Sequence, residues 1–350
     1  MPSRLRLGLV GAGPVVERYH MRAIRAVPEV LPAVVADLDE NRARQFAQKQ
    51  GFARYTTRLE DLFGTVDLAI VALPNGAHAP VSCELLASGV HVLCEKPMAR
   101  NVPECRAMIE AAERGGTKLC IGHNRRFRTN VMLAKRLMEK GIVGEVTRIE
   151  AEEGSTSDWA RSPVYFDPKQ AGGGALIDVG IHSIDLIRCL AGEFRDVRYH
   201  GNGTATTVES DAELRFRLAN GAEGTLVASR TRNLQQHICV TGTEGFIDIG
   251  LWSEHLRVRH NKGKAFQKLP HLDAFVSKRP PQDPSFVLQI TNFVNAIQGT
   301  EKLVVDGYEG MANVDVVTRA YGDGATSTES QGVSGSAAMS SAATQNRGEQ

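Results

Sequence analysis

The chain has 350 residues, enough for two domains that each bury a core without disulfide or metal staples. It carries 41 Lys and Arg against 40 Asp and Glu, so a formal charge of +1 offers no positive field for nucleic acid. The longest apolar run, 68–73, is too short to span a membrane. We therefore expect a cytoplasmic protein with small-molecule partners. The six cysteines include no C-x-x-C pair, so no metal site is expected.

Residues 1–124 alternate β-branched runs with helical patterns, which predicts βαβ units and a parallel sheet. Cap signals predict helices after Asp39, ending at Gly51, and after Thr57, where Glu60 completes a capping box. A third helix is expected to begin near Asn101. This part is predicted to be a doubly wound Rossmann domain. The expected strands are 5–10, 33–37, 68–72, 90–94 and 118–121.

Residues 125–321 have a different pattern, in which strand-like stretches follow one another without intervening helices. They predict a C-terminal α/β domain with a large, mostly antiparallel open sheet. Residues 322–350 are rich in Gly, Ser, Ala and Thr, so we expect a disordered tail. The strand-like stretches are 146–152, 212–218, 224–229, 237–241 and 256–259, and the expected helices are 130–140, 177–190, 284–298 and 308–321.

A glycine pattern follows the first strand and opens a helix, a context that indicates dinucleotide binding. Gly11 would allow the tight turn, and Gly13 would let a pyrophosphate approach the helix N-terminus. Asp37 ends the second strand, where a carboxylate would bind the adenosine ribose and repel a 2′-phosphate. NAD(H) is therefore the preferred cofactor, and NADP(H) is possible because Arg42 is nearby. The alternative is an ordinary strand-to-helix turn.

Two further segments carry titratable side chains suited to alcohol chemistry. Lys96 follows Glu95 at the end of a buried strand, where open α/β sheets bind ligands, and can act as a proton donor or relay. Asp178 and His182 are four residues apart on a predicted helix, so the carboxylate can orient an imidazole that removes an alcohol proton. The alternatives are a salt-bridged lysine and a structural histidine; a metal site is weaker, because no further ligand cluster is evident.

Two other groups of side chains are candidates for substrate contacts. Arg125, Arg126 and Arg128, between the two predicted domains, could bind a substrate carboxylate or a nucleotide-sugar diphosphate. Trp159, Tyr165 and Phe166 could stack on a sugar ring. The alternatives are a solvated crossover segment for the arginines, and a core or subunit-contact role for the aromatic rings.

A series of motifs, in order over residues 5–321, resembles the glucose-fructose oxidoreductase / inositol dehydrogenase / rhizopine-catabolism (Gfo/Idh/MocA) family. The departures from the pattern are Val16, where the glycine loop usually has Gly or Ala, and the long Ser/Ala-rich tail. The motifs are GAGPVVERYH, the aspartate after VVA, LPNGAH, CEKP, NRRF, GGGALIDVGIHSIDL and GTEG.

The resemblance implies that a hydride passes between a nicotinamide and a secondary hydroxyl or ketone of a sugar, cyclitol or sugar derivative. It also implies a homodimer or homotetramer formed through the C-terminal sheet. Lys96, Asp178 and His182 match the family's catalytic trio. We expect the cofactor to contact Gly11, Gly13, Pro14, Val15, Asp37, Arg42, Leu73, Pro74, Asn75, His78, Glu95 and Lys96, and the substrate to contact Lys96, His123, Arg125, Arg126, Trp159, Tyr165, Asp178 and His182.

Two alternative functions remain open for the same fold. One is a redox-neutral hydrolase or lyase that oxidises, eliminates and re-reduces its substrate with a retained cofactor. The other is a regulator that senses a nucleotide without catalysis. The presence of both Lys96 and His182 disfavours the regulator.

Overall fold

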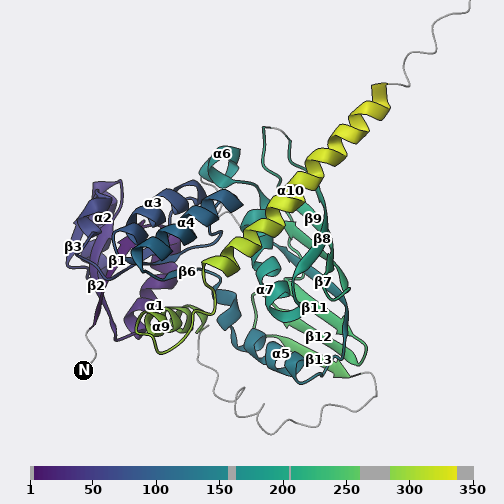
Figure 1. Ribbon diagram of the computed structural model, residues 1–350, viewed down its shortest axis with the longest axis horizontal. Helices are drawn as coiled ribbons and strands as arrows, with labels where there is room; N and C mark the ends of the chain where they lie inside the picture. The colour runs from purple at the N-terminus through teal and green to yellow at the C-terminus, as the bar shows by residue number, and fades with distance from the viewer. Residues whose placement is uncertain (1–3, 157–162, 205, 261–283, 337–350) are drawn as a thin grey trace, which may run out of the picture.

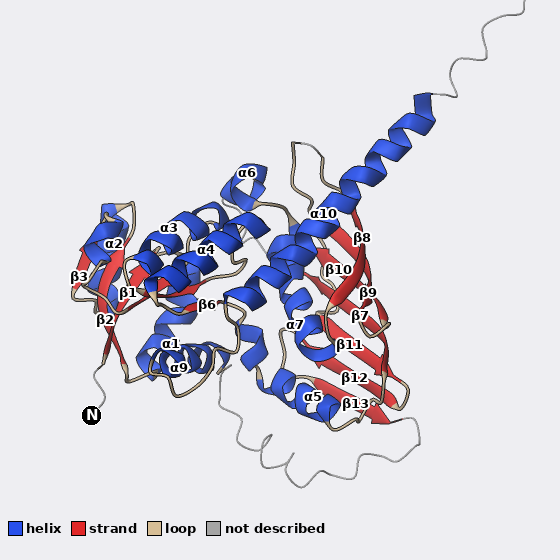
Figure 2. Ribbon diagram, viewed as in Figure 1, coloured by secondary structure: helices blue, strands red, loops and turns tan. Residues whose placement is uncertain are grey.

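The computed structural model describes residues 4–156, 163–204, 206–260 and 284–336. They form two sheets that lie side by side and carry helices between and around them (Figure 1 and Figure 2). The fold is α/β, as the sequence predicted: the N-terminal sheet is parallel and the C-terminal sheet is mostly antiparallel. No helix among the described residues is long and apolar enough to cross a membrane.

The first sheet has six strands in the order β3-β2-β1-β4-β5-β6. The chain leaves β1 toward one edge and later returns to its other side, so the point at which doubly wound sheets have their ligand-binding crevice lies at the ends of β1 and β4. All strands but β3 were predicted; β3 has three residues, none of them buried, and so leaves no apolar run to detect. The bounds are β1 (Leu5–Val10), β2 (Val30–Ala36), β3 (Arg54–Thr56), β4 (Leu68–Val71), β5 (His91–Cys94) and β6 (Leu119–Ile121).

Alternate side chains of these strands pack against helices on opposite faces of the sheet. Leu7 and Leu9 belong to one buried cluster with α1 and α9, and Val71 and Cys94 belong to another with α3 and α4. The helices on these two faces are α1 (Met21–Ala26), α2 (Glu40–Gln50), α3 (Asn75–Ala87), α4 (Val102–Gly115) and α9 (Ser285–Ile297).

The helix ends test the predicted capping signals. The Asp39 side chain accepts a hydrogen bond from the Arg42 N–H, and Gly51 ends α2 in the left-handed conformation, as predicted. The capping box after Thr57 was wrong: only the short 3₁₀ turn η2 (Leu59–Leu62) forms there, with no side-chain cap bond. The left-handed Gly64 follows this turn after one residue and leaves no length for a helix.

The second sheet has seven strands in the order β13-β12-β11-β7-β10-β9-β8. Within this sheet, β7 and β10 are the only described strands that pair in parallel. β8 and β12 were not predicted, because β8 mixes charged with apolar residues and is mostly not buried, and β12 is a short run between glycines. The bounds are β7 (Val146–Gly154), β8 (Phe194–Gly201), β9 (Asp211–Leu218), β10 (Glu223–Ser229), β11 (His237–Gly242), β12 (Gly245–Gly250) and β13 (Leu256–His260).

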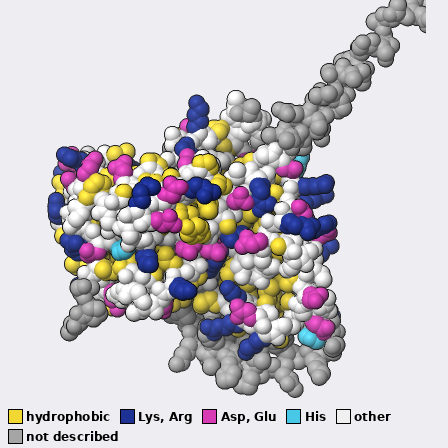
Figure 3. Space-filling view, viewed as in Figure 1, with side chains coloured by type: hydrophobic (Ala, Val, Ile, Leu, Met, Phe, Trp, Pro, Cys, Tyr) yellow, Lys and Arg dark blue, Asp and Glu magenta, His cyan; other side chains and the backbone are white. Residues whose placement is uncertain are grey.

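One face of this sheet packs against α5 (Thr129–Glu139), α7 (Ile181–Ala191) and α10 (Gly307–Ser336) (Figure 2). Along β9, Leu214 and Phe216 are buried toward these helices, while Arg215 and Arg217 alternate with them and are exposed. No helix of the described chain covers this opposite, charged face. Charges of both signs are mixed over the visible surface, in keeping with the small net charge (Figure 3).

Two C-terminal elements differ from the predicted division into domains. Helix α9 was assigned to the second domain, yet Ile290 and Phe293 pack with β1 and α1 of the first. Helix α10 runs to Ser336, past the predicted start of the disordered tail at residue 322; residues 337–350 lie outside the described residues. The sequence from 322 to 336 contains no proline, and continuing an existing helix is much easier than nucleating one.

Candidate active site

The glycine loop after β1 has the conformation that a dinucleotide requires. Gly11 has a φ of +94°, and a Cβ there would overlap the carbonyl oxygen of Ala72, so the protein itself requires glycine. A Cβ on Gly13 would meet no heavy atom within 4 Å, so the space beside it is open. This space fits a pyrophosphate at the start of the helix. Pro14 and Val15 open that helix, and the buried Val16 begins its π-helical turn η1 (Val16–His20).

Asp37 lies beside this loop and is already hydrogen-bonded. Its Oδ2 accepts from the Ala12 N–H at 2.9 Å, and its Oδ1 accepts from Arg42 Nη2, also at 2.9 Å. Burial opposes ionisation, but these hydrogen bonds outweigh it and hold the pKa of Asp37 below its ordinary value. Arg42, whose side chain is about half exposed, forms an ion pair with this carboxylate, which is the group predicted to select the cofactor.

The residues around the start of α3 either lie beside the glycine loop or bond to protein carbonyls. Leu73 lies against the glycine loop, and Pro74 stands at the N-cap of the helix. Asn75 and His78, both predicted to bind the cofactor, are buried and bond to protein carbonyls instead. Asn75 Nδ2 donates to Ala171 O at 2.8 Å, and the two ring nitrogens of His78 lie 2.8 Å from Pro97 O and Leu73 O. These side chains hold the loops together.

Glu95 ties the end of β5 to the helix after the glycine loop. Its Oε1 lies 2.7 Å from Nε2 of the fully buried His20, and its Oε2 accepts from the Lys96 N–H at 3.1 Å. Burial raises the pKa of Glu95, but His20 and Lys96 act more strongly and lower it. The sequence assigned no role to His20.

Lys96 and Asp178 meet at the centre of the site. Lys96 Nζ donates to the backbone oxygen of Asp178 at 2.8 Å and to its Oδ1 at 3.2 Å. Asp178 Oδ2 accepts from Arg230, at 3.0 Å from Nη2 and 3.2 Å from Nε. Burial of Asp178 opposes ionisation, but the two cations hold its pKa below the ordinary value. Arg230, on the loop after β10, was missed because no motif surrounds it.

His182 does not bond to Asp178, which corrects the predicted orientation. Its Nδ1 is buried and has no hydrogen-bond partner among the described residues. The reason is local: Asp178 lies in the π-helical turn η6 (Leu176–Gly180), where bonds close from i to i+5, so residues four apart no longer stack. Burial lowers the pKa of His182 well below its ordinary value, helped by the positive charges of Arg125 and Lys96. The imidazole is therefore neutral and able to accept a proton.

His123 lies beside His182, with the ring centroids 6.3 Å apart. Its Nε2 accepts from Asn313 Nδ2 at 3.1 Å, and burial lowers its pKa to about 4. Its Nδ1 is buried and has no hydrogen-bond partner in the part of the chain that the structure describes. His123 therefore supplies a second neutral imidazole at this end of the site.

Two of the predicted arginines, Arg125 and Arg126, have separate environments. Arg126 is held by Asp185, 2.7 Å from its Nη2, and by Glu309 at the same distance, so its guanidinium is engaged within the protein. Arg125 pairs with the buried Glu153 at 2.5 Å, and its Cζ lies 5.0 Å from the ring centroid of Trp252. The structure therefore brings Arg125, but not Arg126, into the site with an unoccupied donor, Nη1.

The predicted aromatic residues have different outcomes. Trp159 lies outside the described residues, and Tyr165 falls in the 3₁₀ turn η5 (Pro163–Phe166). The Phe166 ring centroid lies 6.0 Å from the Cζ of Arg230. Trp252, on the loop after β12, lies against Arg125. No sequence signal marked Trp252, because it follows a strand that was itself not predicted.

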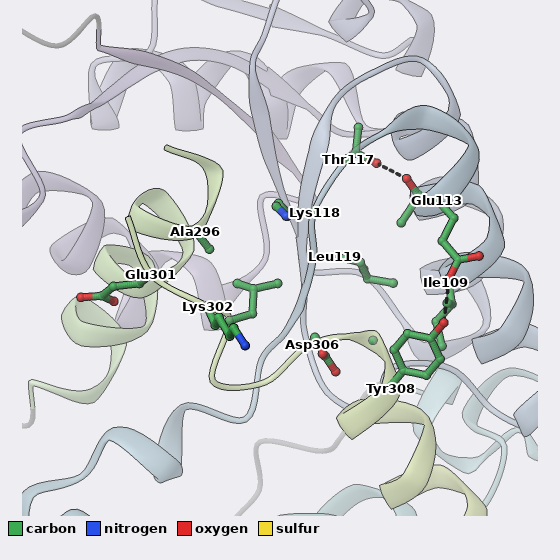
Figure 4. A pocket seen from close by; sticks show the side chains of 13 residues that line it. Ile109, Glu113, Thr117, Lys118, Leu119, Ala296, Glu301, Lys302, Asp306 and Tyr308 are labelled. Atoms are coloured by element: carbon green, nitrogen blue, oxygen red, sulfur yellow. Dashed lines mark hydrogen bonds between the residues drawn. The ribbon is translucent and has the colours of Figure 1, made fainter. Parts of the chain in front are cut away.

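A separate pocket of about 360 Å³ lies between α4, β6, α9 and the start of α10 (Figure 4). Tyr308 donates to Glu113 Oε1 at its wall at 2.7 Å. None of its lining residues belongs to the predicted site, so the candidate active site rests on the side-chain cluster and not on this pocket. The described residues also include no group of three His, Cys, Asp or Glu that could hold a metal.

Comparison with known proteins agrees with this geometry. Residues 5–123 match the family model described as "Oxidoreductase family, NAD-binding Rossmann fold", and residues 131–248 match the "GFO/IDH/MocA C-terminal domain". The chain is 30% identical to levoglucosan dehydrogenase of Pseudarthrobacter phenanthrenivorans over 288 residues, covering 70% of this chain and 73% of that protein. The chain belongs to the Gfo/Idh/MocA family.

Other members of the Gfo/Idh/MocA family support the assignment. The rhizopine catabolism protein MocA of Rhizobium meliloti is 32% identical over 257 residues, which cover 70% of this chain and 78% of that protein. A levoglucosan dehydrogenase solved in complex with NADH and levoglucosan has the same fold, with a TM-score of 0.80 and 24% identity over 92% of this chain and 98% of that chain. The protein is therefore an oxidoreductase with an NAD-binding Rossmann domain.

Proposed function

We propose that the protein transfers hydride between NAD(H) and a secondary hydroxyl or ketone on the ring of a sugar, cyclitol or sugar derivative. The observation that carries the proposal is the buried ion pair of Lys96 with Asp178 just after the end of β5, near enough to the buried His182 for the Lys96 charge to lower the pKa of that imidazole. The names of the relatives, a levoglucosan dehydrogenase and a rhizopine catabolism protein, support a polyhydroxylated substrate.

The residues of the glycine loop and its surroundings would hold the cofactor. Gly11 allows the tight turn of the loop and Gly13 leaves the backbone open to the pyrophosphate, Asp37 would accept from the ribose, and Leu73 and Pro74 would line the crevice. When bound, the nicotinamide ring accepts the hydride from the alcohol carbon or returns it to the ketone. Asn75 and His78 would act indirectly, by fixing the loops that surround the crevice.

Lys96 and His182 would share the proton of the substrate oxygen. The Lys96 ammonium donates to the backbone and carboxylate oxygens of Asp178 and has a further N–H for the reacting oxygen. There it would stabilise the developing negative charge. His182 is neutral and would take the hydroxyl proton during oxidation. Asp178 and Arg230 act one step away, because their ion pair fixes where the Lys96 ammonium lies.

Preference for NAD(H) over NADP(H) is supported by Asp37, whose carboxylate would face a 2′-phosphate carrying about two negative charges. Arg42 weakens this discrimination, because it pairs with the same carboxylate at 2.9 Å and can turn toward a phosphate. We therefore expect a moderate preference for NAD(H), with NADP(H) used less efficiently.

We also infer a homodimer or homotetramer that forms through the open face of the second sheet. The face is rich in charges of both signs, including the pairs Arg148–Glu150 and Arg217–Glu223, which favours contact with a second copy over an apolar partner. Light scattering should report a dimer or larger species. Reversing the charge of both Arg215 and Arg217 should shift it toward monomer, and an unchanged mass would contradict this interface.

The test of the activity is a panel of sugars, cyclitols and nucleotide sugars, each with NAD and with NADP, followed by NADH or NADPH absorbance. The expected result is one ketone formed for each NADH, confirmed by NMR of the product. Bond cleavage without net NADH would favour the redox-neutral alternative. Cofactor binding without any turnover of the panel would favour the regulator.

A further inference from the structure

Arg125 is buried, yet part of its guanidinium is left without a partner. The residue is 5% exposed and lies in the 3₁₀ turn η3 (Asn124–Phe127), directly after His123. Its Nη2 lies 2.5 Å from Glu153 Oε1, and Ser183 Oγ donates to the other oxygen of that carboxylate at 3.0 Å. Its Nη1 is buried, and no acceptor for it exists among the residues described here.

A buried guanidinium N–H without an acceptor is costly, because it has lost water and gained nothing in exchange. The Glu153 carboxylate is already engaged by Arg125 Nη2 and by the Ser183 hydroxyl. It leaves Arg125 Nη1 without an acceptor. A ligand that brings acceptor oxygens to Nη1 would remove the deficit. The planar fork of arginine suits a carboxylate best, because two oxygens can accept in parallel.

The ring of Trp252 lies beside the Arg125 guanidinium. The Arg125 Cζ lies 5.0 Å from its ring centroid, yet the tryptophan is 64% exposed. A ring that is mostly exposed can shift without disturbing a core, and so can uncover Nη1 and pack on the apolar face of a pyranose. This pairing of an aromatic face with an unsatisfied cation is suited to a ligand that is both a sugar and an anion.

The charges around His182 also favour an anion. Those that lower its pKa, besides burial, are the positive groups Arg125 and Lys96 and the neighbouring His123. Asp178 is neutralised by Lys96 and Arg230 and does not bond to this imidazole. A substrate carboxylate near Arg125 would offset the positive potential at His182 and make it a better proton acceptor.

We propose that Arg125 and Trp252 form a subsite for the carboxylate of a sugar acid, so that the substrate oxidised at Lys96 and His182 is a uronate or related polyhydroxy acid. This proposal rests on the proposed function and narrows its substrate class. A neutral sugar could offer Nη1 only a hydroxyl oxygen, without the charge and the parallel pair of oxygens that a carboxylate supplies, and would therefore bind less well.

The experiment compares pairs of sugars that differ only at one carbon, D-glucuronate with D-glucose and D-galacturonate with D-galactose. kcat/KM is measured with NAD for each member, and calorimetry gives the affinity of each for the NADH-loaded protein. The wild type should prefer the acid of at least one pair by about tenfold or more, in kcat/KM and in affinity. If the neutral member is used and bound as well as the acid in both pairs, the proposal is overturned.

Variants test the assignment of the subsite. Arg125→Met combined with Glu153→Gln removes the ion pair without leaving a buried charge, and should lower the acid-to-neutral ratio about tenfold, to near one. Arg125→Lys keeps a charge without the fork and should lower the ratio partly; it serves if the double variant fails to fold. Trp252→Leu should also reduce the ratio. Arg114→Met, at an exposed arginine on α4 of the first domain, is the matched control and should not change it.

The outcomes separate this proposal from the proposed function. Oxidation of neutral sugars with no preference for acids overturns the sugar-acid subsite and leaves the dehydrogenase intact. Binding of NADH without oxidation of any sugar or acid contradicts the proposed function, and calorimetry then decides the subsite alone. A preference for the acid that persists in the Arg125 variants would mean that another residue holds the carboxylate.

Discussion

The surroundings of Asp178 and of His182 differ in how completely their polar groups are satisfied. Asp178 has each carboxylate oxygen bonded, to Lys96 on one side and to Arg230 on the other. Around His182, in contrast, three buried nitrogens have no hydrogen-bond partner among the described residues: His182 Nδ1, His123 Nδ1 and Arg125 Nη1. The first group is already ordered by the protein, while the second has the donors and acceptors that a substrate would satisfy.

The largest effect is expected where the two groups meet, at Lys96. Lys96→Met removes the donor to the reacting oxygen and should lower kcat/KM by about 10³-fold or more, because both charge stabilisation and proton transfer are lost. NADH affinity, measured by fluorescence titration, should change far less. A matched Lys118→Met variant, away from the site, should keep wild-type turnover. Near wild-type activity in Lys96→Met would show that the ordered group is only structural.

Asp178→Asn tests whether the satisfied group depends on charge. Lys96 and Arg230 would lose their shared carboxylate, so the free energy of unfolding at neutral pH should fall by about 3 to 5 kcal/mol. Since the folded-state pKa of Asp178 is lowered, its stabilisation is complete above about pH 4 and is lost on acidification. The difference between wild type and variant in denaturant titrations should therefore shrink below that pH. A difference that does not depend on pH would contradict the charge pairing.

The Asp37–Arg42 pair tests whether charge also matters where the cofactor is expected to bind. Asp37→Asn keeps an acceptor for the Ala12 N–H but removes the negative charge, so the ratio of NADPH to NADH dissociation constants should fall about tenfold. Arg42→Met should act in the opposite direction, by weakening NADPH binding. An unchanged ratio in both variants would mean that neither side chain faces the 2′ position.

The smallest effect is expected at the C-terminus. Truncation after Asp323 keeps the Tyr321 hydroxyl on Glu209, at 2.8 Å, and the Asp323 carboxylate on the Tyr199 N–H, at 3.1 Å. The segment removed consists mainly of small and polar residues, so the melting temperature should fall by no more than about 2 °C and turnover should be unchanged. A loss of several degrees would show that this part of α10 docks on the body or on a second copy.

Periodicity and motifs predicted most of the fold. The strand β1 and the helices α2 and α4 have strong local signals: an apolar run, an N-cap side chain and a terminal glycine. Strand β3 was missed because its residues are not buried. Helix α9 was assigned to the wrong domain because the apolar stripe of an amphipathic helix predicts that it packs on a core, but not on which one.

The site was predictable as a set of residues and less so as a set of contacts. Lys96 and Asp178 do meet, but the partnership of Asp178 with His182 assumed a regular α-helix where a π-helical turn lies. Arg230, Glu153 and Trp252 come from strands and loops whose positions are decided by sheet order, which one-dimensional patterns do not contain. Asn75 and His78 carry a family motif, yet they bond to backbone carbonyls.

The central claim is that His182 exchanges the proton of the reacting oxygen instead of supporting the fold, and His182→Asn tests it most directly. Turnover on an oxidised substrate, NADH affinity and melting temperature are measured on the same preparation. We predict a loss of about 10² to 10⁴ in kcat, with NADH affinity within about twofold and little change in melting temperature. A stable His182→Asn protein with near wild-type turnover would contradict the account.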